Sequence, residues 1–355
     1  MKIKEIHVRK ENLELTRPYT IAYKTISAVE SCVVEMVAAE GTYGLGAANP
    51  SYQVVGEDMD ACLEALSEEN LGRLIGRDIS EYRSICEDLH RLFPNNPGAK
   101  AALDIAYHDL FTKSQDISLI QFLGQKIESL PTSITIGIKN VEETLDEAQE
   151  YYDRGFKILK VKLGQSVDVD LERLIKLREH FGNDMGIRVD ANQGYSRWDM
   201  QRFHKETKDL RLELVEQPLP ADEPEEFRRL PEEVRQTVAA DESLISAQDA
   251  YQMATDPPVC GIYNIKLMKC GGIYQSLRIA EIARLGGIDL MWGCNDESII
   301  SISAALNAAF ASEKTKYIDL DGSLDLARDV VKGGFVLKDG MMSLAGGIGL
   351  GVEKV

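Results

Sequence analysis

The sequence predicts an α/β protein in which a TIM-like (β/α) barrel carries an α+β capping domain. Two observations predict the barrel: eight short β-rich runs follow one another from about residue 131, and helix-like stretches separate them. A third observation predicts the cap, because the first 125 residues begin with strand-like alternation and continue with helical patterning. A chain of 355 residues is long enough for both parts.

The predicted capping domain covers residues 1–125. Residues 3–8 and 32–38 alternate between apolar and polar side chains, as half-buried strands do. Two polar loops, at 16–27 and 44–56, accompany these strands, and residues 99–113 carry apolar side chains at helical intervals. The glycine-rich tail, residues 325–355, cannot supply another barrel unit, so we expect it to return to the cap.

The predicted barrel covers residues 126–324. Two of its helix-like stretches end at Gly155 and Gly182, which suit helix C-termini. Strand–helix alternation repeated this often predicts a parallel sheet, and eight units predict a closed barrel. The eight β-rich runs are TSITIGI, FKILKVKL, GIRVDAN, LELVEQP, TVAADES, GIYNIKLMK, IDLMWGC and TKYIDLDG.

The overall composition excludes several classes of partner. The chain carries 58 acidic and 40 basic residues, a formal net charge of −18, which repels nucleic acid and anionic membranes. The N-terminus lacks the apolar run of a signal peptide, and no stretch approaches the roughly 18 apolar residues of a membrane-spanning helix. The six cysteines are scattered singly, which suits a reducing cytoplasm. We therefore expect a cytoplasmic protein with neither nucleic-acid nor membrane partners.

Three acidic residues end consecutive strand-like runs: Asp190, Glu216 and Asp241, separated by 26 and 25 residues. In a barrel the C-terminal ends of the strands converge on one mouth, so these carboxylates should face one another. Such an arrangement is costly unless a cation lies between them, and oxygen ligands suit magnesium better than zinc. Three unrelated carboxylates that face water or cap helices are the alternative, which the regular spacing disfavours.

Lysines occupy neighbouring strand-like runs. Lys160 and Lys162 lie two residues apart in KVK and share a face, and Lys266 lies in NIKLMK. A lysine that points into a barrel is costly unless it is paired or functional. We expect Lys162 and Lys266 to face a metal-bound substrate from opposite sides. We expect Lys160 to lower the pKa of the base by like-charge repulsion, or to hold a substrate carboxylate. The alternative is that the lysines extend outward into water.

Together, the KVK motif, the three strand-end acids and Lys266 resemble the enolase superfamily, in its muconate-lactonizing-enzyme-like branch, over nearly the whole chain. The resemblance implies a modified (β/α)7β barrel with one Mg²⁺ per subunit, held by the three acids. It implies that Lys162 and Lys266 act as acid and base around an enolate-like intermediate. Related proteins often assemble, which leaves a homo-oligomer open.

Histidine usage narrows the branch of the family. Mandelate-racemase-like members carry a histidine base late in the barrel. No histidine of this chain lies at a predicted barrel-strand end, and none follows Lys266; the five are His7, His90, His108, His180 and His204. A pair of lysines is therefore favoured over a histidine–lysine pair.

Two lysines permit epimerisation, cycloisomerisation or the elimination of o-succinylbenzoate synthases, and the last strand distinguishes among them. Asp319 and Asp321 lie two apart in KYIDLDGSL, so both should point into the barrel mouth. A carboxylate pair favours a cation such as a substrate ammonium. This DxD is similar to the motif with which dipeptide epimerases bind the substrate's α-ammonium. It predicts an isomerase that moves the α-proton of a dipeptide's C-terminal residue.

The alternatives within the family are an o-succinylbenzoate synthase and a muconate-type cycloisomerase, whose substrates give no reason for the DxD. A non-catalytic barrel that only binds metal is the alternative outside enzymes. Such a chain is expected to lose one of the three lysines or one of the three predicted metal-binding acids. All six residues are present in this sequence.

Two residues bear on the side chains of the dipeptide, and they disagree. Asp296, in GCNDES, occupies a position that is often apolar in related epimerases, and it favours a basic side chain. Lys24, in the first cap loop, lies where epimerases for Ala-Glu carry a cation. Thr135 is expected to point inward and to donate a hydrogen bond to substrate, although barrel packing explains it equally well. We expect basic or polar dipeptides, with L-Ala-D/L-Glu as the chief alternative.

Overall fold

The computed structural model describes residues 1–21 and 24–355, and the side chains of residues 18–26 lie outside the description. The capping sheet is antiparallel, in the order β1-β2-β3, with bounds β1 (Ile3–Ile21), β2 (Lys24–Ala38) and β3 (Tyr43–Ala48). Helix α5 (Pro97–Ser114) packs directly on β3. A side chain at Gly46 would collide with the Ala102 carbonyl, 1.9 Å away, so glycine allows this close approach.

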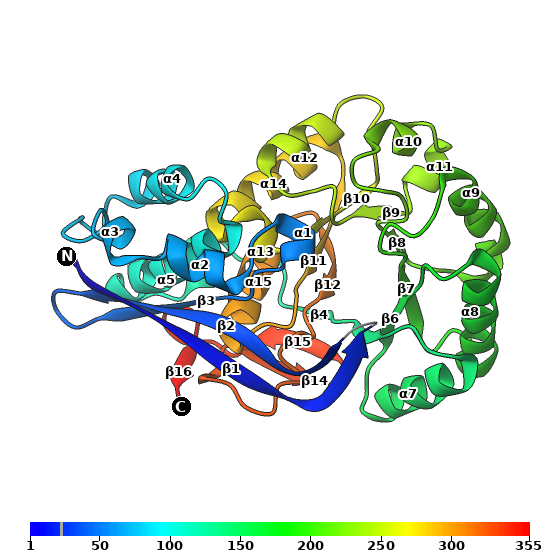
Figure 1. The fold of residues 1–355 in the computed structure, drawn as a ribbon, viewed down its shortest axis with the longest axis horizontal. Helices are drawn as coiled ribbons and strands as arrows, with labels where there is room; N and C mark the ends of the chain where they lie inside the picture. Colours follow the sequence, from blue (N-terminus) through cyan, green and yellow to red (C-terminus); the bar gives the residue numbers. More distant parts are fainter. Residues whose placement is uncertain (22–23) are drawn as a thin grey trace.

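Five shorter helices complete this region: α1 (Tyr52–Val55), α2 (Met59–Ala65), α3 (Glu68–Leu71), α4 (Tyr82–Leu92) and α6 (Leu119–Leu123). In Figure 1 the hairpin of β1 and β2 runs from the cap helices toward the barrel, where Arg17 of β1 contacts Glu150. The cap therefore reaches past its own helices to the barrel.

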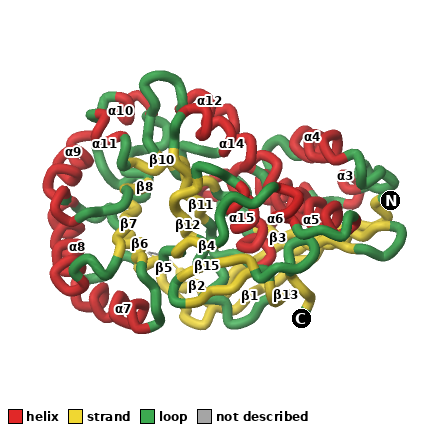
Figure 2. The backbone as a smooth tube through the Cα atoms, turned by 180° about the vertical axis from the view of Figure 1, so that it is seen from behind, coloured by secondary structure: helices red, strands yellow, loops and turns green. Residues whose placement is uncertain are grey.

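The barrel sheet has eight parallel strands in sequence order, and helices cover its outside (Figure 2). A bridge between Thr132 and Ile318 joins the two ends of the sheet. The strands are β5 (Ile134–Ile136), β6 (Ile158–Lys162), β7 (Gly186–Asp190), β8 (Val215–Glu216), β9 (Val238–Ala240), β10 (Ile262–Ile265), β11 (Asp289–Gly293) and β12 (Thr315–Asp319).

Helical segments follow each of the first seven strands, whereas in the described chain β12 leads into the tail without one, so the predicted (β/α)7β architecture is confirmed. Local sequence starts these helices: the Asn140 side chain accepts from the Glu143 backbone at α7, and Ser166 caps α8 in the same way. The segments are α7 (Val141–Asp153), α8 (Val167–Phe181), α9 (Arg197–Glu206), η1 (Lys208–Leu210), α10 (Pro224–Arg228), α11 (Glu232–Arg235), α12 (Ala247–Met253), α13 (Leu267–Cys270), α14 (Ile273–Gly286) and α15 (Ile299–Ala311).

The C-terminal tail contacts both parts of the molecule. The Leu350 amide donates to Asp109 of α5, and the Thr16 amide of β1 donates to the Asp325 carbonyl. Strand β15 instead pairs with β4, at the start of the barrel region. The predicted division at residue 125 stays a prediction. The remaining strands are β4 (Ser129–Pro131), β13 (Val331–Gly333), β14 (Phe335–Lys338), β15 (Met341–Leu344) and β16 (Val352–Lys354).

None of the helices in the described part of the chain is long and apolar enough to cross a membrane.

Candidate active site

The three predicted metal acids lie side by side at one end of the barrel. Asp190 ends β7, Glu216 ends β8 and Asp241 directly follows β9, and these strands are neighbours in the sheet. The exposed fraction of each acid is 2% or less. The Asp241 amide donates to the Gln217 side chain at 2.9 Å, which holds the loop after β9 against the end of β8. The barrel thus brings together the acids that the strand spacing predicts.

Each acid meets a lysine through one oxygen. The distances are 2.6 Å from Lys162 Nζ to Asp190 Oδ2, 2.8 Å from Lys160 Nζ to Glu216 Oε2, and 2.9 Å from Lys266 Nζ to Asp241 Oδ2. Burial and the charge of Asp190 raise the pKa of Glu216 to about 8. The acids therefore repel one another even though four ammonium groups, those of Lys160, Lys162, Lys266 and Lys269, contact them.

This set of residues fits a divalent cation. The three buried carboxylates supply only oxygen ligands, which Mg²⁺ prefers. In the structure the ammonium of Lys160 already occupies the space between two of them, because its Nζ also lies 3.4 Å from Asp190 Oδ2. A positive charge at this point is therefore what the geometry favours. Asp190, Glu216 and Asp241 are the residues that would hold the metal.

The two predicted acid/base lysines come from opposite sides of the barrel. Lys162 ends β6 and Lys266 directly follows β10, and these strands lie four apart in a ring of eight. Burial lowers the pKa of Lys266, but the Asp241 carboxylate outweighs it and holds the pKa above its ordinary value. Gly293 leaves room for this lysine, since a Cβ there would lie 3.2 Å from Lys266 Cε.

The two aspartates of the DxD motif have different hydrogen-bond partners in the structure. Asp319 is buried and engaged through both oxygens, by Ser133 Oγ at 2.6 Å and by Lys160 Nζ at 2.8 Å. Asp321 accepts from the Thr135 amide at 2.9 Å through Oδ2, and its Oδ1 lies 3.9 Å from the Cys294 thiol. Burial and the charge of Asp319 raise the pKa of Asp321 to about 7. Asp321 is therefore better placed to receive an ammonium.

A cavity of about 610 Å³ lies over these residues, between the cap and the barrel. The cap contributes residues 28–30 of β2 and residues 49–54, which run from the end of β3 into α1, and the barrel contributes Thr135 and Asp296. Among the described residues, three lysines, Lys160, Lys162 and Lys266, line the cavity together with eight acids: Glu30, Asp58, Asp241, Glu242, Asp296, Asp319, Asp321 and Asp325. The cavity is thus strongly acidic. The side chain of Lys24, the opposing clue to specificity, lies outside the described residues.

Two buried residues of this region were not singled out from the sequence. Lys269 donates to Asp241, and Asn264 donates to Glu216 Oε1 at 2.7 Å. Asn264 precedes Lys266 by two positions, so strand alternation already places both on one face. Lys269 gives no such signal, because the chain turns into the short helix α13 directly after Lys266.

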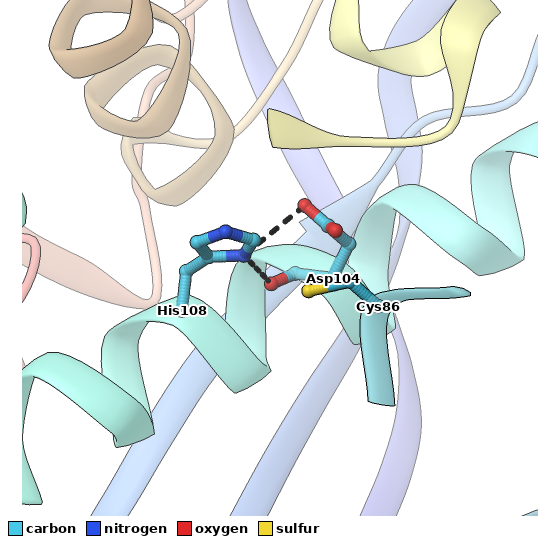
Figure 3. A group of neighbouring side chains, drawn as sticks. All are labelled: Cys86, Asp104 and His108. Atoms are coloured by element: carbon cyan, nitrogen blue, oxygen red, sulfur yellow. Dashed lines mark hydrogen bonds and ion pairs between the residues drawn. The ribbon is translucent and has the colours of Figure 1, made fainter. Parts of the chain in front are cut away.

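A second cluster of side chains of the types that bind metals lies in the described part of the cap, outside the cavity. Cys86, Asp104 and His108 place their ligand atoms within 4.8 Å of one another (Figure 3). His108 Nδ1 is 2.7 Å from the Asp104 carbonyl, so this nitrogen must carry a proton and donate it. Asp104 Oδ1 accepts from the Ile273 amide at 2.5 Å. The group therefore serves as a hydrogen-bonded link between α5 and the start of α14.

Comparison with known proteins agrees with this geometry. Residues 143–354 match the family model described as enolase C-terminal domain-like. Residues 3–124 match the N-terminal domain of the mandelate racemase / muconate lactonizing enzyme model. The chain is 51% identical to an L-Lys-D/L-Arg epimerase of Desulforapulum autotrophicum, across 100% of both chains. It is 36% identical to a hydrophobic dipeptide epimerase of Enterococcus faecalis, across 99% of this chain and 100% of the relative.

Among solved structures, the chain resembles a dipeptide epimerase from Methylococcus capsulatus complexed with Mg and the dipeptide L-Arg-D-Lys. The TM-score is 0.96 at 50% sequence identity, and the alignment covers 99% of each chain.

Proposed function

Because this chain belongs to the mandelate racemase / muconate lactonizing enzyme family of the enolase superfamily, we propose that it epimerises dipeptides with basic side chains. One observation carries the proposal: two lysines on opposite sides of the barrel line an acidic cavity and pair with two of three neighbouring buried acids. The reaction is a proton transfer at the α-carbon of the dipeptide's C-terminal residue. Relatives with the same kind of activity at 49% and 51% identity support it.

The residues of the site have different roles in the proposed reaction. Lys162 removes or returns the proton on one face of the α-carbon, and Lys266 acts on the other face, so the configuration inverts. One Mg²⁺ per subunit, when bound, would stabilise the negative charge that develops on the substrate carboxylate. Asp321 receives the substrate's α-ammonium, and Thr135 orients Asp321 through its amide. Cap and barrel enclose the substrate together and exclude water from it.

The charge of the cavity favours basic side chains over acidic ones. Among the described residues of the cavity, eight acids against three lysines would repel the extra carboxylate of an Ala-Glu dipeptide and attract an ammonium or guanidinium. Asp296 contributes to this field beside the site. The non-peptide substrates of o-succinylbenzoate synthases and cycloisomerases would leave Asp321 without an ammonium. A metal-binding barrel without activity would not need both lysines.

Three further expectations concern the domain bounds, the location in the cell and the oligomeric state. The capping domain consists of residues 1–125 with 325–355, and the barrel of residues 126–324. The protein is cytoplasmic, which its six free cysteines support. A homo-oligomer stays open, and light scattering on the purified protein decides between it and a monomer.

The first test is incubation with L-Lys-L-Arg and Mg²⁺ in deuterium oxide, followed by mass spectrometry and chiral analysis. We expect deuterium at the α-carbon of the C-terminal residue together with inversion there. L-Ala-L-Glu is the matched substrate, and it should react more slowly. Faster turnover of L-Ala-L-Glu would contradict the specificity, and no exchange in any dipeptide would contradict epimerisation.

A further inference from the structure

The two oxygens of each metal acid have different kinds of partner. One oxygen of each faces a lysine that lines the cavity: Asp190 Oδ2, Glu216 Oε2 and Asp241 Oδ2. The other oxygen is held from behind by a donor of the surrounding protein. These donors are the Asn192 amide at 2.9 Å from Asp190 Oδ1, Asn264 Nδ2 at 2.7 Å from Glu216 Oε1, and Lys269 Nζ on Asp241 Oδ1.

Lys269 is fully committed to this supporting role. It is buried, with 2% of its surface exposed. Besides Asp241 Oδ1, its ammonium donates to the Asp241 carbonyl at 2.6 Å and to the Asn264 carbonyl at 3.0 Å. An ammonium has three protons, so all of them are used. Lys269 is therefore no acid or base for substrate, in contrast to Lys266.

Lys269 and Asn264 form one connected support. Lys269 holds the Asn264 carbonyl on β10, and the Asn264 side chain holds Glu216 on β8. The Asn264 Oδ1 atom makes no hydrogen bond within the described structure, so the amide group serves Glu216 alone. The side chains of Asn264 and Lys269 thus bind Glu216 Oε1 and Asp241 Oδ1, the oxygens that do not face a lysine of the cavity.

We propose that Lys269 and Asn264 are positioning residues that make the acid site selective for Mg²⁺ over Ca²⁺. They bind one oxygen each of Asp241 and Glu216, so that only the other oxygen, which faces a cavity lysine, can reach the metal. This inference rests on the proposed function for the identity of the metal. Mg²⁺ takes six ligands in a strict octahedron, whereas Ca²⁺ takes six to eight and accepts carboxylates through both oxygens. Carboxylates with one oxygen withheld suit the smaller ion and leave positions for water and substrate.

The test measures the ratio of Ca²⁺ to Mg²⁺ affinity by isothermal titration calorimetry of the full-length protein, without substrate. Lys269→Met removes the donor at similar side-chain length, and Asn264→Leu removes the other donor without a change in charge. Each should raise the Ca²⁺/Mg²⁺ affinity ratio by about tenfold or more, as outer ligand partners typically contribute 10- to 100-fold to metal affinity. The ratio is the informative quantity, because the lost charge of Lys269 affects both divalent ions alike.

Two further variants serve as controls. Lys269→Arg keeps a donor on Asp241 Oδ1 and should leave the ratio closer to that of the parent. Lys113→Met removes a comparable lysine–aspartate pair in the cap, where Lys113 Nζ lies 2.7 Å from Asp109, and should leave the ratio unchanged.

A ratio within twofold of the parent in Asn264→Leu and in Lys269→Met would overturn the inference. If Lys269→Met does not fold, Asn264→Leu decides alone. The variants could change the Ca²⁺/Mg²⁺ affinity ratio while the parent protein fails to epimerise dipeptides. This result would contradict the proposed function only. Epimerisation with an unchanged ratio in the variants would contradict this inference only.

Discussion

Each proposed catalytic lysine is paired with a single acid, Lys162 with Asp190 and Lys266 with Asp241. They differ in exposure, with 29% of the Lys162 side chain and 9% of the Lys266 side chain accessible. Lys160 contacts three acids, Asp190, Glu216 and Asp319, which together hold its pKa well above the ordinary value although burial acts against this. Lys160 is therefore protonated at neutral pH in this structure, and its effect on the base stays a prediction.

Replacement of either catalytic lysine tests the two-base mechanism. Lys162→Ala and Lys266→Ala should each lower the rate of epimerisation at least about 100-fold, since a positioned acid or base typically contributes 10²–10⁴-fold. Each variant should still exchange the α-proton of one stereoisomer with deuterium, because the opposite lysine remains. NMR of the two stereoisomers in deuterium oxide measures this. The exposed Lys157→Ala is the control, and full activity in either catalytic variant would exclude two bases.

The ionisation of Asp321 should set the pH dependence of substrate binding. Its pKa is raised to about 7 by burial and by Asp319, so it becomes neutral as the pH falls below 7. A neutral carboxyl loses its attraction for an ammonium, and KM for free-amine dipeptides should therefore rise below pH 7. Asp321→Asn should raise KM at pH 8 by about tenfold, since hydrogen bonds to charged groups contribute roughly 1.5–3 kcal/mol.

In Asp321→Asn the rise of KM below pH 7 should also disappear. N-acetylated dipeptides provide the comparison, because they carry no α-ammonium. Equal KM values for free and N-acetylated dipeptides in the parent protein would show that Asp321 has another role.

At the scale of elements, helix α14 begins with help from the cap. Gly272 at its N-terminus has φ of 105°, and a Cβ there would lie 2.4 Å from Asp104 Oδ1. In place of a capping side chain of its own, the Ile273 and Tyr274 amides donate to Asp104 of α5. The segment from Lys266 to α14 is thus held by Lys269 at one end and by the cap at the other.

Removal of this contact should destabilise the protein as a whole. Asp104→Ala leaves the first amides of α14 buried without an acceptor, and we expect a loss of about 2 kcal/mol in the free energy of unfolding. Urea denaturation followed by circular dichroism measures it. Ser166→Ala, which removes an exposed cap within α8 alone, is the matched control and should cost about 0.5–1 kcal/mol. An equal or smaller loss in Asp104→Ala would mean that α14 does not depend on the cap.

At the scale of the whole molecule, cap and barrel share the cavity and several direct contacts. Arg17 of β1 forms two parallel hydrogen bonds with Glu150 of α7, at 3.0 and 2.7 Å. The C-terminal tail adds hydrogen bonds to β1 and α5, so the cap contacts both the barrel and the tail. The buried acids Asp190, Glu216 and Asp241 repel one another, and a cation bound to them would relieve that repulsion.

Mg²⁺ should therefore stabilise the folded protein. A ligand at 100 times its Kd stabilises the folded state by about 2.7 kcal/mol, and Tm should rise accordingly on addition of Mg²⁺ and fall again with EDTA. Glu216→Gln should lose most of this response, because it removes the central acid of the three. Differential scanning calorimetry measures both proteins, and an equal rise in Tm for the variant would place Mg²⁺ elsewhere.

The sequence by itself determined the barrel, the acids and the paired lysines. Strand periodicity assigns side chains to a face, and the spacing of one strand–helix unit assigns them to a barrel end, so Asp190, Glu216 and Asp241 follow from local pattern. The same logic places Lys162 and Lys266, four strands apart.

Only the tertiary structure decided which oxygen of each acid faces a lysine of the cavity. Asp319 is bound by Lys160, 159 residues away, and Lys269 reaches Asp241 across 28 residues, beyond the end of its strand. The physical reason is that hydrogen-bond partners depend on distances between side chains from different elements. Sequence spacing sets the direction of a side chain and leaves these distances open.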